Sequence, residues 1–295
     1  MLGQILVASF YKYAVIECPD SLKKEQIELC TSLNLKGRIL IGNEGINGSI
    51  SGTMDEVRKF QEILLKDILF HGMDFKEQAA EKHAFNRLYI SIRKEVVHFG
   101  TDAKLGNKAD YIQPEQLNEL IEGDHDIILL DVRNNYETRI GKFKNAITLD
   151  IRNFRDFPKA VSNLAYLKEK RIVTYCTGGI RCEKASAYLK EQNFKNVLQL
   201  QGGILNYGKS FPHGYFEGEC FVFDDRLSIP LGKESEPLNE CVWCKVKTGK
   251  YINCHNIDCD LLFVCCENCL HERNASCSGK CAASQRRRIK NMIHN

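Results

Sequence analysis

The sequence predicts a multidomain α/β protein made of three consecutive segments. Two observations lead to this expectation. In the middle of the chain, continuous apolar runs alternate with helical patterns, as in a domain with a mostly parallel sheet. The C-terminal part has few long apolar runs and holds most of the cysteines. A chain of 295 residues is long enough for two or three domains of ordinary size.

The first segment, residues 1–105, shows the element order βαββαβ. A helix is predicted over Pro19–Leu33, and a second helix is opened by the capping box at Thr53-Met54-Asp55-Glu56. That second helix places Val57, Phe60 and Leu64 on one face. Strands are expected at Gln4–Phe10 and Arg38–Ile41. Gly45–Ser51 suggests a turn followed by another strand, and Arg87–Phe99 alternates like a strand pair. This order is typical of a ferredoxin-like (acylphosphatase-like) α+β domain.

The second segment, residues 111–212, follows a polar linker at Thr101–Asp110. Pro114 begins a short helix, and a longer helix is expected from about Cys182 to Gln192. Buried strands are predicted at Ile127–Leu130, Ile172–Tyr175 and Val197–Leu200. Strands that alternate with helices in this way indicate an α/β domain with a mostly parallel sheet.

The overall properties of the chain narrow its class. The formal charge of +3 does not by itself indicate a polyanionic partner. No run of about 18 apolar residues is present, so no membrane span is expected. Residues Met1–Ile5 lack the basic and apolar start of a signal peptide, which favours a cytoplasmic location. In a reducing compartment, 14 cysteines indicate metal binding or thiol chemistry rather than disulfides.

The most informative stretch runs from Tyr175 to Cys182. Cys176 follows a buried strand, and a helix begins just after it, where α/β sheets bind their ligands. Gly178 and Gly179 allow the backbone to wrap its N–H groups around one point, between Thr177 and Ile180. The helix N-terminus and Arg181 add positive charge, which should stabilise a thiolate. We therefore expect Cys176 to be a reactive nucleophile and Arg181 to support it.

This loop resembles the active-site loop of the rhodanese family. Cys176 to Arg181 spans six residues, as in the sulfurtransferase branch, whereas the related phosphatases have seven. Asp131-Val132-Arg133 and Gln201-Gly202-Gly203 also match the rhodanese pattern, with Asp131 and Arg133 in supporting roles. Cys182 has two readings that the sequence leaves equal: it resolves an oxidised Cys176 as a disulfide, or it is a small residue packed at the helix start.

Four motifs in this order closely resemble the bacterial tRNA uridine(34) hydroxylases. They are Asn43-Glu44-Gly45-Ile46-Asn47-Gly48, Arg87 to Glu95, the loop continued into Glu183-Lys184-Ala185-Ser186, and Phe223-Asp224-Asp225-Arg226. The resemblance implies oxygen-dependent hydroxylation of the wobble uridine to 5-hydroxyuridine, with Cys176 as the active-site, persulfide-forming cysteine. It also implies molecular oxygen as co-substrate and tRNA, through its anticodon arm, as partner. The electron donor is open, and the sequence has no haem, flavin or nicotinamide fingerprint.

Several residues are candidate RNA contacts. Arg87, Arg93 and Lys94 surround Tyr89, and such residues contact phosphates and stack on unpaired bases. Asn43, Glu44 and Asn47 are candidates for hydrogen bonds to a base edge, although Asn and Gly also form ordinary turns. The basic run Arg286–Lys290 is a further candidate. Each of these has an alternative reading as a solvated surface or a turn.

The third segment, residues 213–295, is predicted to be held together by its cysteines. One set of four has the knuckle spacing of tetrahedral zinc sites, and four further cysteines are candidates for a second site. Cys265 is then left over as a buried residue, with His255 and His271 as reserve ligands. The alternatives are reduced cysteines packed in a small core and disulfides formed during purification. The candidate ligands are Cys241, Cys244, Cys266 and Cys269 for one site, and Cys254, Cys259, Cys277 and Cys281 for the other.

Two other functions compete with hydroxylation. A sulfurtransferase would move a persulfide sulfur from Cys176 to cyanide, a carrier protein or tRNA. A non-catalytic RNA- or protein-binding module would keep the rhodanese fold without its chemistry. The intact Cys176 and Arg181 argue against the second alternative.

Overall fold

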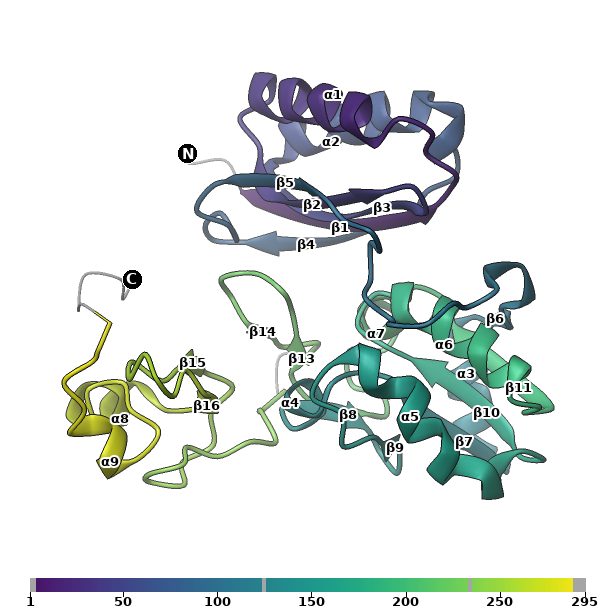
Figure 1. Ribbon diagram of the computed structural model, residues 1–295. Coiled ribbons are helices and arrows are strands. Elements are labelled where there is room, and N and C mark those ends of the chain that lie inside the picture. Colours follow the sequence, from purple (N-terminus) through teal and green to yellow (C-terminus); the bar gives the residue numbers. More distant parts are fainter. Residues whose placement is uncertain (1–3, 124–125, 233–234, 289–295) are drawn as a thin grey trace.

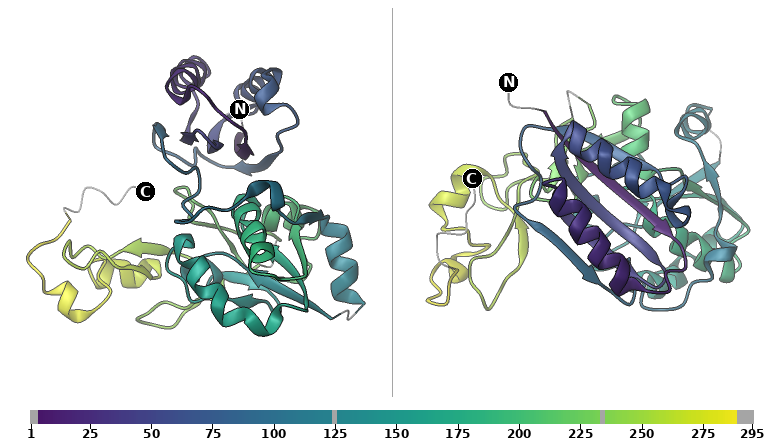
Figure 2. Two further views of the ribbon diagram at one scale, coloured as in Figure 1. Left: turned by 45° about the vertical axis from the view of Figure 1, so that its right-hand side comes forward. Right: turned by 90° about the horizontal axis from the view of Figure 1, so that it is seen from above.

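The computed structural model describes residues 4–123, 126–232 and 235–288. Three units follow one another along the chain (Figure 1). An N-terminal α+β domain lies over a central α/β domain, and a smaller cysteine-rich unit lies beside the central domain (Figures 1 and 2). Within the described residues, no helix is long and apolar enough to cross a membrane.

The N-terminal domain has one five-stranded sheet with the order β4-β1-β3-β2-β5. The first four strands of that order pair antiparallel with one another. Strand β5 lies at the edge of the sheet and pairs with β2 in parallel. This is the ferredoxin-like arrangement, with one additional edge strand. The elements are β1 (Ile5–Tyr13), α1 (Pro19–Ser32), β2 (Lys36–Gly42), β3 (Gly45–Thr53), α2 (Met54–Lys66), the 3₁₀ turn η1 (Ile68–Phe70), β4 (Phe75–Ala80) and β5 (Leu88–Ile92).

The two helices cover only one face of this sheet (Figure 1). Ala8 and Phe10 of β1 pack into the core with Phe60 of α2. Because side chains alternate along a strand, Tyr11 and Tyr13 lie on the opposite, helix-free face. That helix-free face is turned toward the central domain (Figure 1). The predicted capping box is present: the Glu56 N–H donates to Thr53 Oγ1, and the Thr53 N–H donates to Glu56.

The predicted strand pair over Arg87–Phe99 is wrong. Only β5 (Leu88–Ile92) is a strand there, and the chain from Arg93 to Phe99 is a loop. The other strand is β4 (Phe75–Ala80), whose sequence FKEQAA lacks the β-branched residues that mark strands. Its pairing with β1, a non-local contact, makes it a strand.

The central domain has a five-stranded, fully parallel sheet with the order β6-β11-β10-β7-β9. Side chains from α5, η4 and α6 pack on one face, and those from α3 and α7 pack on the other. The elements are η2 (Leu105–Asn107), β6 (Asp110–Ile112), α3 (Pro114–Glu122), β7 (Ile127–Asp131), α4 (Asn135–Thr138), β9 (Ile147–Thr148), η3 (Phe154–Asp156), α5 (Phe157–Val161), η4 (Ser162–Leu167), β10 (Arg171–Tyr175), α6 (Ile180–Glu191), β11 (Asn196–Leu200) and α7 (Gly203–Ser210).

Two boundaries differ from the expected ones. The stretch predicted as a polar linker includes η2 and ends in Asp110, the first residue of edge strand β6. The helix predicted from about Cys182 starts two residues earlier, at Ile180. Gly179, in the left-handed region with φ of 101°, makes the sharp turn from loop to helix possible.

The C-terminal part contains short elements only. Strand β12 joins it to the central domain by pairing with β8, whereas β13 pairs with β14 and β15 pairs with β16 inside the C-terminal part. The Tyr251 hydroxyl donates to the Tyr136 carbonyl at 2.7 Å, which ties that unit to α4. The elements are β8 (Gly141–Phe143) with β12 (Phe216–Gly218), β13 (Cys220–Phe221) with β14 (Ser228–Ile229), β15 (Tyr251–Asn253) with β16 (Leu262–Val264), α8 (Glu267–Glu272) and α9 (Gly279–Ala282).

Candidate active site

Cys176 lies in a loop between the C-terminal end of β10 and the N-terminus of α6. The Gly179 N–H donates to Cys176 Sγ at 3.1 Å. The whole residue is buried, with 0% of its surface exposed. The loop therefore holds the sulfur in a closed cradle of backbone donors, as the Cys-Thr-Gly-Gly sequence predicted.

The surroundings of Cys176 favour its thiolate. Burial acts to raise the pKa of Cys176, because it penalises charge. A hydrogen bond from Cys182, the charge of Arg181, and the N–H groups of Arg181 and Gly179 outweigh burial and lower this pKa to about 5. This lowered pKa favours the thiolate at neutral pH, and the thiolate is the form in which a cysteine acts as a nucleophile.

Arg181 is held in place by a residue that the sequence analysis missed. Its guanidinium forms a two-pronged ion pair with Glu137 of α4, with N–O distances of 2.5 and 2.7 Å. Glu137 is fully buried and Arg181 is 5% exposed. A bidentate pair of this kind fixes the orientation of the guanidinium. The only sequence signal was the capping box at Asn134-Asn135-Tyr136-Glu137, which predicts a helix start rather than an ion pair.

The two other rhodanese-like motifs, residues 131–133 and 201–203, lie next to the cysteine loop and hold its backbone in place. The N–H groups of Ile204 and Leu205 donate to the carbonyls of Cys176 and Thr177 at 2.9 and 3.1 Å. A Cβ on Gly203 would lie 2.3 Å from the Cys176 carbonyl oxygen, so only glycine allows this approach. Asp131 and Arg133 form a fully buried ion pair at 2.6 Å, and the Arg133 guanidinium also donates to the Gly141 carbonyl.

Cys182 is fully buried on the first turn of α6. It packs in the core beside α5 and also acts as a hydrogen-bond partner of Cys176. Burial raises the pKa of Cys182 well above its usual value, and the neighbouring Cys176 raises it further. Cys182 is therefore the thiol of the pair and Cys176 the thiolate. This geometry is compatible with both readings of Cys182.

The helix-free face of the N-terminal sheet covers this loop. The Tyr13 hydroxyl donates to the Ile180 carbonyl at 3.4 Å, and the Tyr11 hydroxyl donates to Glu183 at 3.0 Å. Glu183 also accepts from Tyr111 and Lys108. A pocket of about 190 Å³ lies at this junction, lined in part by Tyr11, Lys76, Lys108 and Gly202.

The residues of the Asn43–Gly48 motif make contacts inside the protein. Lys184 of α6 forms ion pairs with Glu44 at 2.9 Å and with Glu95 at 3.0 Å. Asn43 donates to the Ile16 carbonyl, and Asn47 donates to the Val96 carbonyl. The ion pairs of Lys184 join the N-terminal domain to α6, whereas the Asn43 and Asn47 contacts stay within the N-terminal segment.

Arg87, Tyr89, Arg93 and Lys94 are all exposed, at the edge of the N-terminal sheet. Arg93 donates to the Tyr89 hydroxyl at 3.2 Å, and the Arg38 guanidinium lies 5.9 Å from the centre of the Tyr89 ring. Arg38 is a member of this group that the sequence analysis did not single out. The register of β2 and β5 places it beside Tyr89.

The Phe223–Arg226 motif lies between the other parts of the site. The Arg181 guanidinium is 5.5 Å from the centre of the Phe223 ring, and 54% of Phe223 is exposed. Asp224 pairs with Arg226, which also reaches Gln78 of β4. The motif thus carries an exposed aromatic ring next to the cysteine loop and attaches it to the N-terminal sheet.

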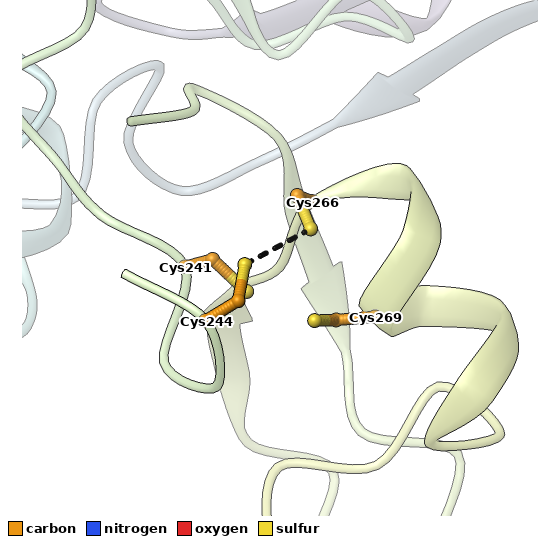
Figure 3. A group of neighbouring side chains, drawn as sticks. All are labelled: Cys241, Cys244, Cys266 and Cys269. Atoms are coloured by element: carbon orange, nitrogen blue, oxygen red, sulfur yellow. Dashed lines mark hydrogen bonds between the residues drawn. The ribbon is translucent and has the colours of Figure 1, made fainter. Parts of the chain in front are cut away.

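The cysteines of the C-terminal unit converge in the two sets of four that their spacing suggested. Cys241, Cys244, Cys266 and Cys269 form the first, with their sulfurs turned toward one another (Figure 3). The second set is Cys254, Cys259, Cys277 and Cys281. In the described part of the chain, Cys265, His255 and His271 belong to neither set. Both sets have the ligands and proximity to hold a metal ion.

The arginines of the basic C-terminal run are occupied within the unit. Arg286 pairs with Asp258 at 2.5 Å, and Arg288 pairs with Asp260. The Arg287 guanidinium donates to the Cys281 carbonyl at 2.7 Å. Ile289 and Lys290, which belong to the same run, lie outside the described residues, as do Met1 to Gly3 at the other end.

The fold and the cysteine cradle define a rhodanese-type protein with an additional domain on each side. Family models agree along the chain: "UPF0176 acylphosphatase like domain" matches residues 5–96, "Rhodanese-like domain" matches 113–210, and "Rhodanase C-terminal" matches 217–282. The tRNA uridine(34) hydroxylase of Cytophaga hutchinsonii is 40% identical over 97% of this chain and 91% of its own length. Those of Onion yellows phytoplasma and Enterococcus faecalis are 37% and 38% identical, over 95% and 96% of this chain and 93% and 90% of their own lengths. The chain belongs to the tRNA uridine(34) hydroxylase family.

Proposed function

We propose that this protein hydroxylates uridine 34 of tRNA to 5-hydroxyuridine and that Cys176 is its reactive group. The observation that carries the proposal is the cradle that holds Cys176 as a thiolate, in a chain of this family. Within the cradle, Arg181 stabilises the sulfur anion and Glu137 orients Arg181. Thr177, Gly178, Gly179 and Ile180 supply the loop backbone, and Asp131 and Arg133 brace the strand ends beneath it.

The reaction replaces the C5–H bond of uracil by C5–OH. With molecular oxygen as co-substrate, one oxygen atom enters the base and the other leaves as water. That balance requires two electrons and two protons from a separate reductant. A base can reach Cys176 only when the side chains that cover it move, because the residue is fully buried. The Tyr11 and Tyr13 contacts with α6 hold the N-terminal sheet against the helix that follows Cys176, so we propose that they loosen when the base enters.

We propose that the flanking units hold the anticodon arm while the cysteine loop receives the base. Uridine 34 lies in a single-stranded loop, so little pairing energy opposes its extrusion. The exposed group at Arg87, Tyr89, Arg93 and Lys94 offers cations and a ring to that RNA. The contacts that Asn43, Glu44 and Asn47 make inside the protein favour structural roles for these residues over base-edge contacts. The same proposal places the protein in the cytoplasm.

Phe223→Ala should raise the KM for tRNA by about tenfold. Its half-exposed ring beside Arg181 is suited to stack on an unpaired pyrimidine, and base–aromatic stacking contributes about 1–3 kcal/mol. Phe223→Tyr keeps the ring and should keep the KM. Steady-state kinetics with an anticodon stem-loop measures both variants. An unchanged KM in Phe223→Ala would show that the ring does not contact the substrate.

Replacing Arg87, Arg93 and Lys94 together by Ala should weaken tRNA binding and make it less sensitive to salt. Each phosphate contact to single-stranded RNA contributes a slope of about −0.7 in log K against log salt, so losing three should flatten the slope by about 2. Fluorescence anisotropy at several salt concentrations measures this. Cys176 alkylation should be unaffected, because the three residues lie on the N-terminal sheet edge.

A matched control removes the same charge from the opposite face of the domain. Lys24, Lys59 and Lys66 are exposed on α1 and α2, the helices that cover the other side of the sheet. Their replacement by Ala should leave the salt slope as in wild type. If both triple variants behave alike, only overall charge matters and the sheet edge is not the RNA path.

Nucleoside mass spectrometry of tRNA from cells lacking the protein tests the function itself. We expect 5-hydroxyuridine and its derivatives to disappear. The rhodanese-like domain also favours a second candidate, sulfur transfer from a Cys176 persulfide, for which a thiolated nucleoside would disappear instead. No change in any tRNA nucleoside would support a non-catalytic binding module and reject both enzymes.

A further inference from the structure

In the C-terminal unit, residues 241–288, eight cysteines form two separate sets of four. Within each set, the four sulfurs are close enough to bind one metal ion. In each set, all ligand atoms lie within 4.8 Å of one another. The sulfur–sulfur distances are 3.5 Å for Cys244–Cys266, 3.6 Å for Cys259–Cys277 and 3.7 Å for Cys277–Cys281. A zinc ion with four bonds of about 2.3 Å sets tetrahedral edges of about 3.8 Å. A disulfide needs about 2.05 Å. The observed sulfur–sulfur distances are close to those between ligands of one tetrahedral metal ion and far longer than a disulfide bond.

Packing alone does not explain this convergence. A free cysteine behaves as a small apolar residue, and it has no reason to meet three others at one point. Cys265 shows what a packing cysteine looks like in this unit. It is fully buried and donates to the Cys266 carbonyl at 3.5 Å, and within the described residues it belongs to neither set. The other eight cysteines are distinguished from it by their arrangement in fours.

The apolar core of this unit is small and consists mainly of cysteines. Apart from cysteines, the buried members of its hydrophobic cluster are Phe263, Leu270 and Ala275. Its regular structure in the described residues is one short strand pair, β15 with β16, and the short helices α8 and α9. A unit this small needs cross-links or metal ions to hold one structure. Since the described cysteines are all free, metal ions are the available means.

The arginine run, Arg286–Arg288, contacts the loop that carries two ligands of the second set. Arg287 pairs with Asn256 as an isolated bridge, and the Arg288 N–H donates to the His255 carbonyl at 2.8 Å. Both partners lie in the loop between the ligands Cys254 and Cys259. Asn256 in turn donates to Cys281 Sγ at 3.4 Å. A zinc ion with four thiolates carries a net charge of −2. Arg286 and Arg288 are paired with Asp258 and Asp260, whereas the Arg287 guanidinium donates to the carbonyl of the ligand Cys281 and brings a positive charge next to this site.

We infer that the C-terminal unit binds two zinc ions, one through Cys241, Cys244, Cys266 and Cys269 and one through Cys254, Cys259, Cys277 and Cys281, and that the second ion holds the arginine run against the unit. Each coordinating thiol gives up its proton to solvent on binding, so no oxidant or reductant takes part. The inference does not depend on the proposed reaction, because it concerns residues outside the cysteine loop.

Metal analysis of the full chain, purified under reducing conditions without chelator, tests the stoichiometry. We expect two zinc ions per chain in the wild type and one in either Cys244→Ser or Cys259→Ser. Cys265→Ser is the matched control, the same change at a buried cysteine outside both sets, and should keep two. Folded wild type with fewer than two ions, or an equal loss in Cys265→Ser, would overturn the inference.

Cobalt substitution keeps the test valid if a serine variant fails to fold. Exchange of zinc for Co²⁺ in the wild-type chain should give the visible absorption of tetrahedral cobalt with thiolate ligands, at two equivalents per chain. Saturation at fewer equivalents, or spectra of octahedral cobalt, would contradict two four-cysteine sites. Intact mass under non-reducing conditions that shows disulfides among the eight ligands would do the same.

Limited trypsin digestion tests whether the second zinc ion holds the arginine run against the unit. Cleavage at Arg286–Arg288 should be about tenfold faster after chelation, because release of the second ion frees this segment to open locally. Cys259→Ser should show the fast rate without chelator, whereas Cys244→Ser should keep the run protected. If the two variants are cleaved at the same rate, the second ion does not hold the arginine run.

Discussion

Cys176→Ser should abolish tRNA hydroxylation, with a loss of at least about 10³-fold in turnover, while the fold remains intact. Serine has nearly the same size, so the closed loop can accommodate it. Its hydroxyl, however, does not ionise near neutral pH, whereas the pKa of Cys176 is lowered to about 5. Turnover on an anticodon stem-loop and circular dichroism measure the two properties.

Cys220→Ser is the matched control for this change. Cys220 is another fully buried cysteine in strand β13, and burial raises its pKa to about 12, so it is an inert thiol. Its replacement should leave most of the activity. Near wild-type turnover in Cys176→Ser would exclude the thiolate from the reaction. This outcome is independent of whether 5-hydroxyuridine disappears from the tRNA of cells that lack the protein, which tests the function itself.

Arg181→Ala should have the second largest effect, a shift of the Cys176 alkylation profile to higher pH. In the wild type, the rate with iodoacetamide should rise through about pH 5 and level off above it, following the thiolate. The guanidinium stabilises the charged form of Cys176, so its removal raises the pKa and moves the midpoint up by more than about 1 pH unit. At intermediate pH, less thiolate is then present and turnover should fall.

Arg181→Ala also leaves Glu137 as an unpaired buried carboxylate, which costs about 3–5 kcal/mol of stability. The double variant Arg181→Gln with Glu137→Gln removes both charges and avoids that penalty. It should show the same upward shift in a more stable protein. An alkylation profile unchanged from wild type in the double variant would exclude Arg181 from stabilising the thiolate.

Local sequence was sufficient wherever the chemistry depends on neighbours in the chain. The Cys176–Arg181 loop was recognisable because a strand end, two glycines, a cation and a helix start follow one another directly. The two sets of cysteines could be grouped by spacing, because each pairs two short-range knuckles or turns. The order βαββαβ was likewise visible in apolar periodicity, even though the position of one strand was wrong.

Contacts between distant residues had no such signal and were decided by the tertiary structure. Glu137 and Arg181 are 44 positions apart, and Tyr11 and Glu183 are 172 apart, yet these pairs orient the cation and cover the loop. Lys184 joins Glu44 across 140 positions, so a residue that resembles a base-edge contact is part of a domain joint. The arginines at the C-terminus look free in sequence and are paired in three dimensions. The physical reason is the same in each case: a buried or paired charge needs a partner, and the fold alone determines which partner comes within reach.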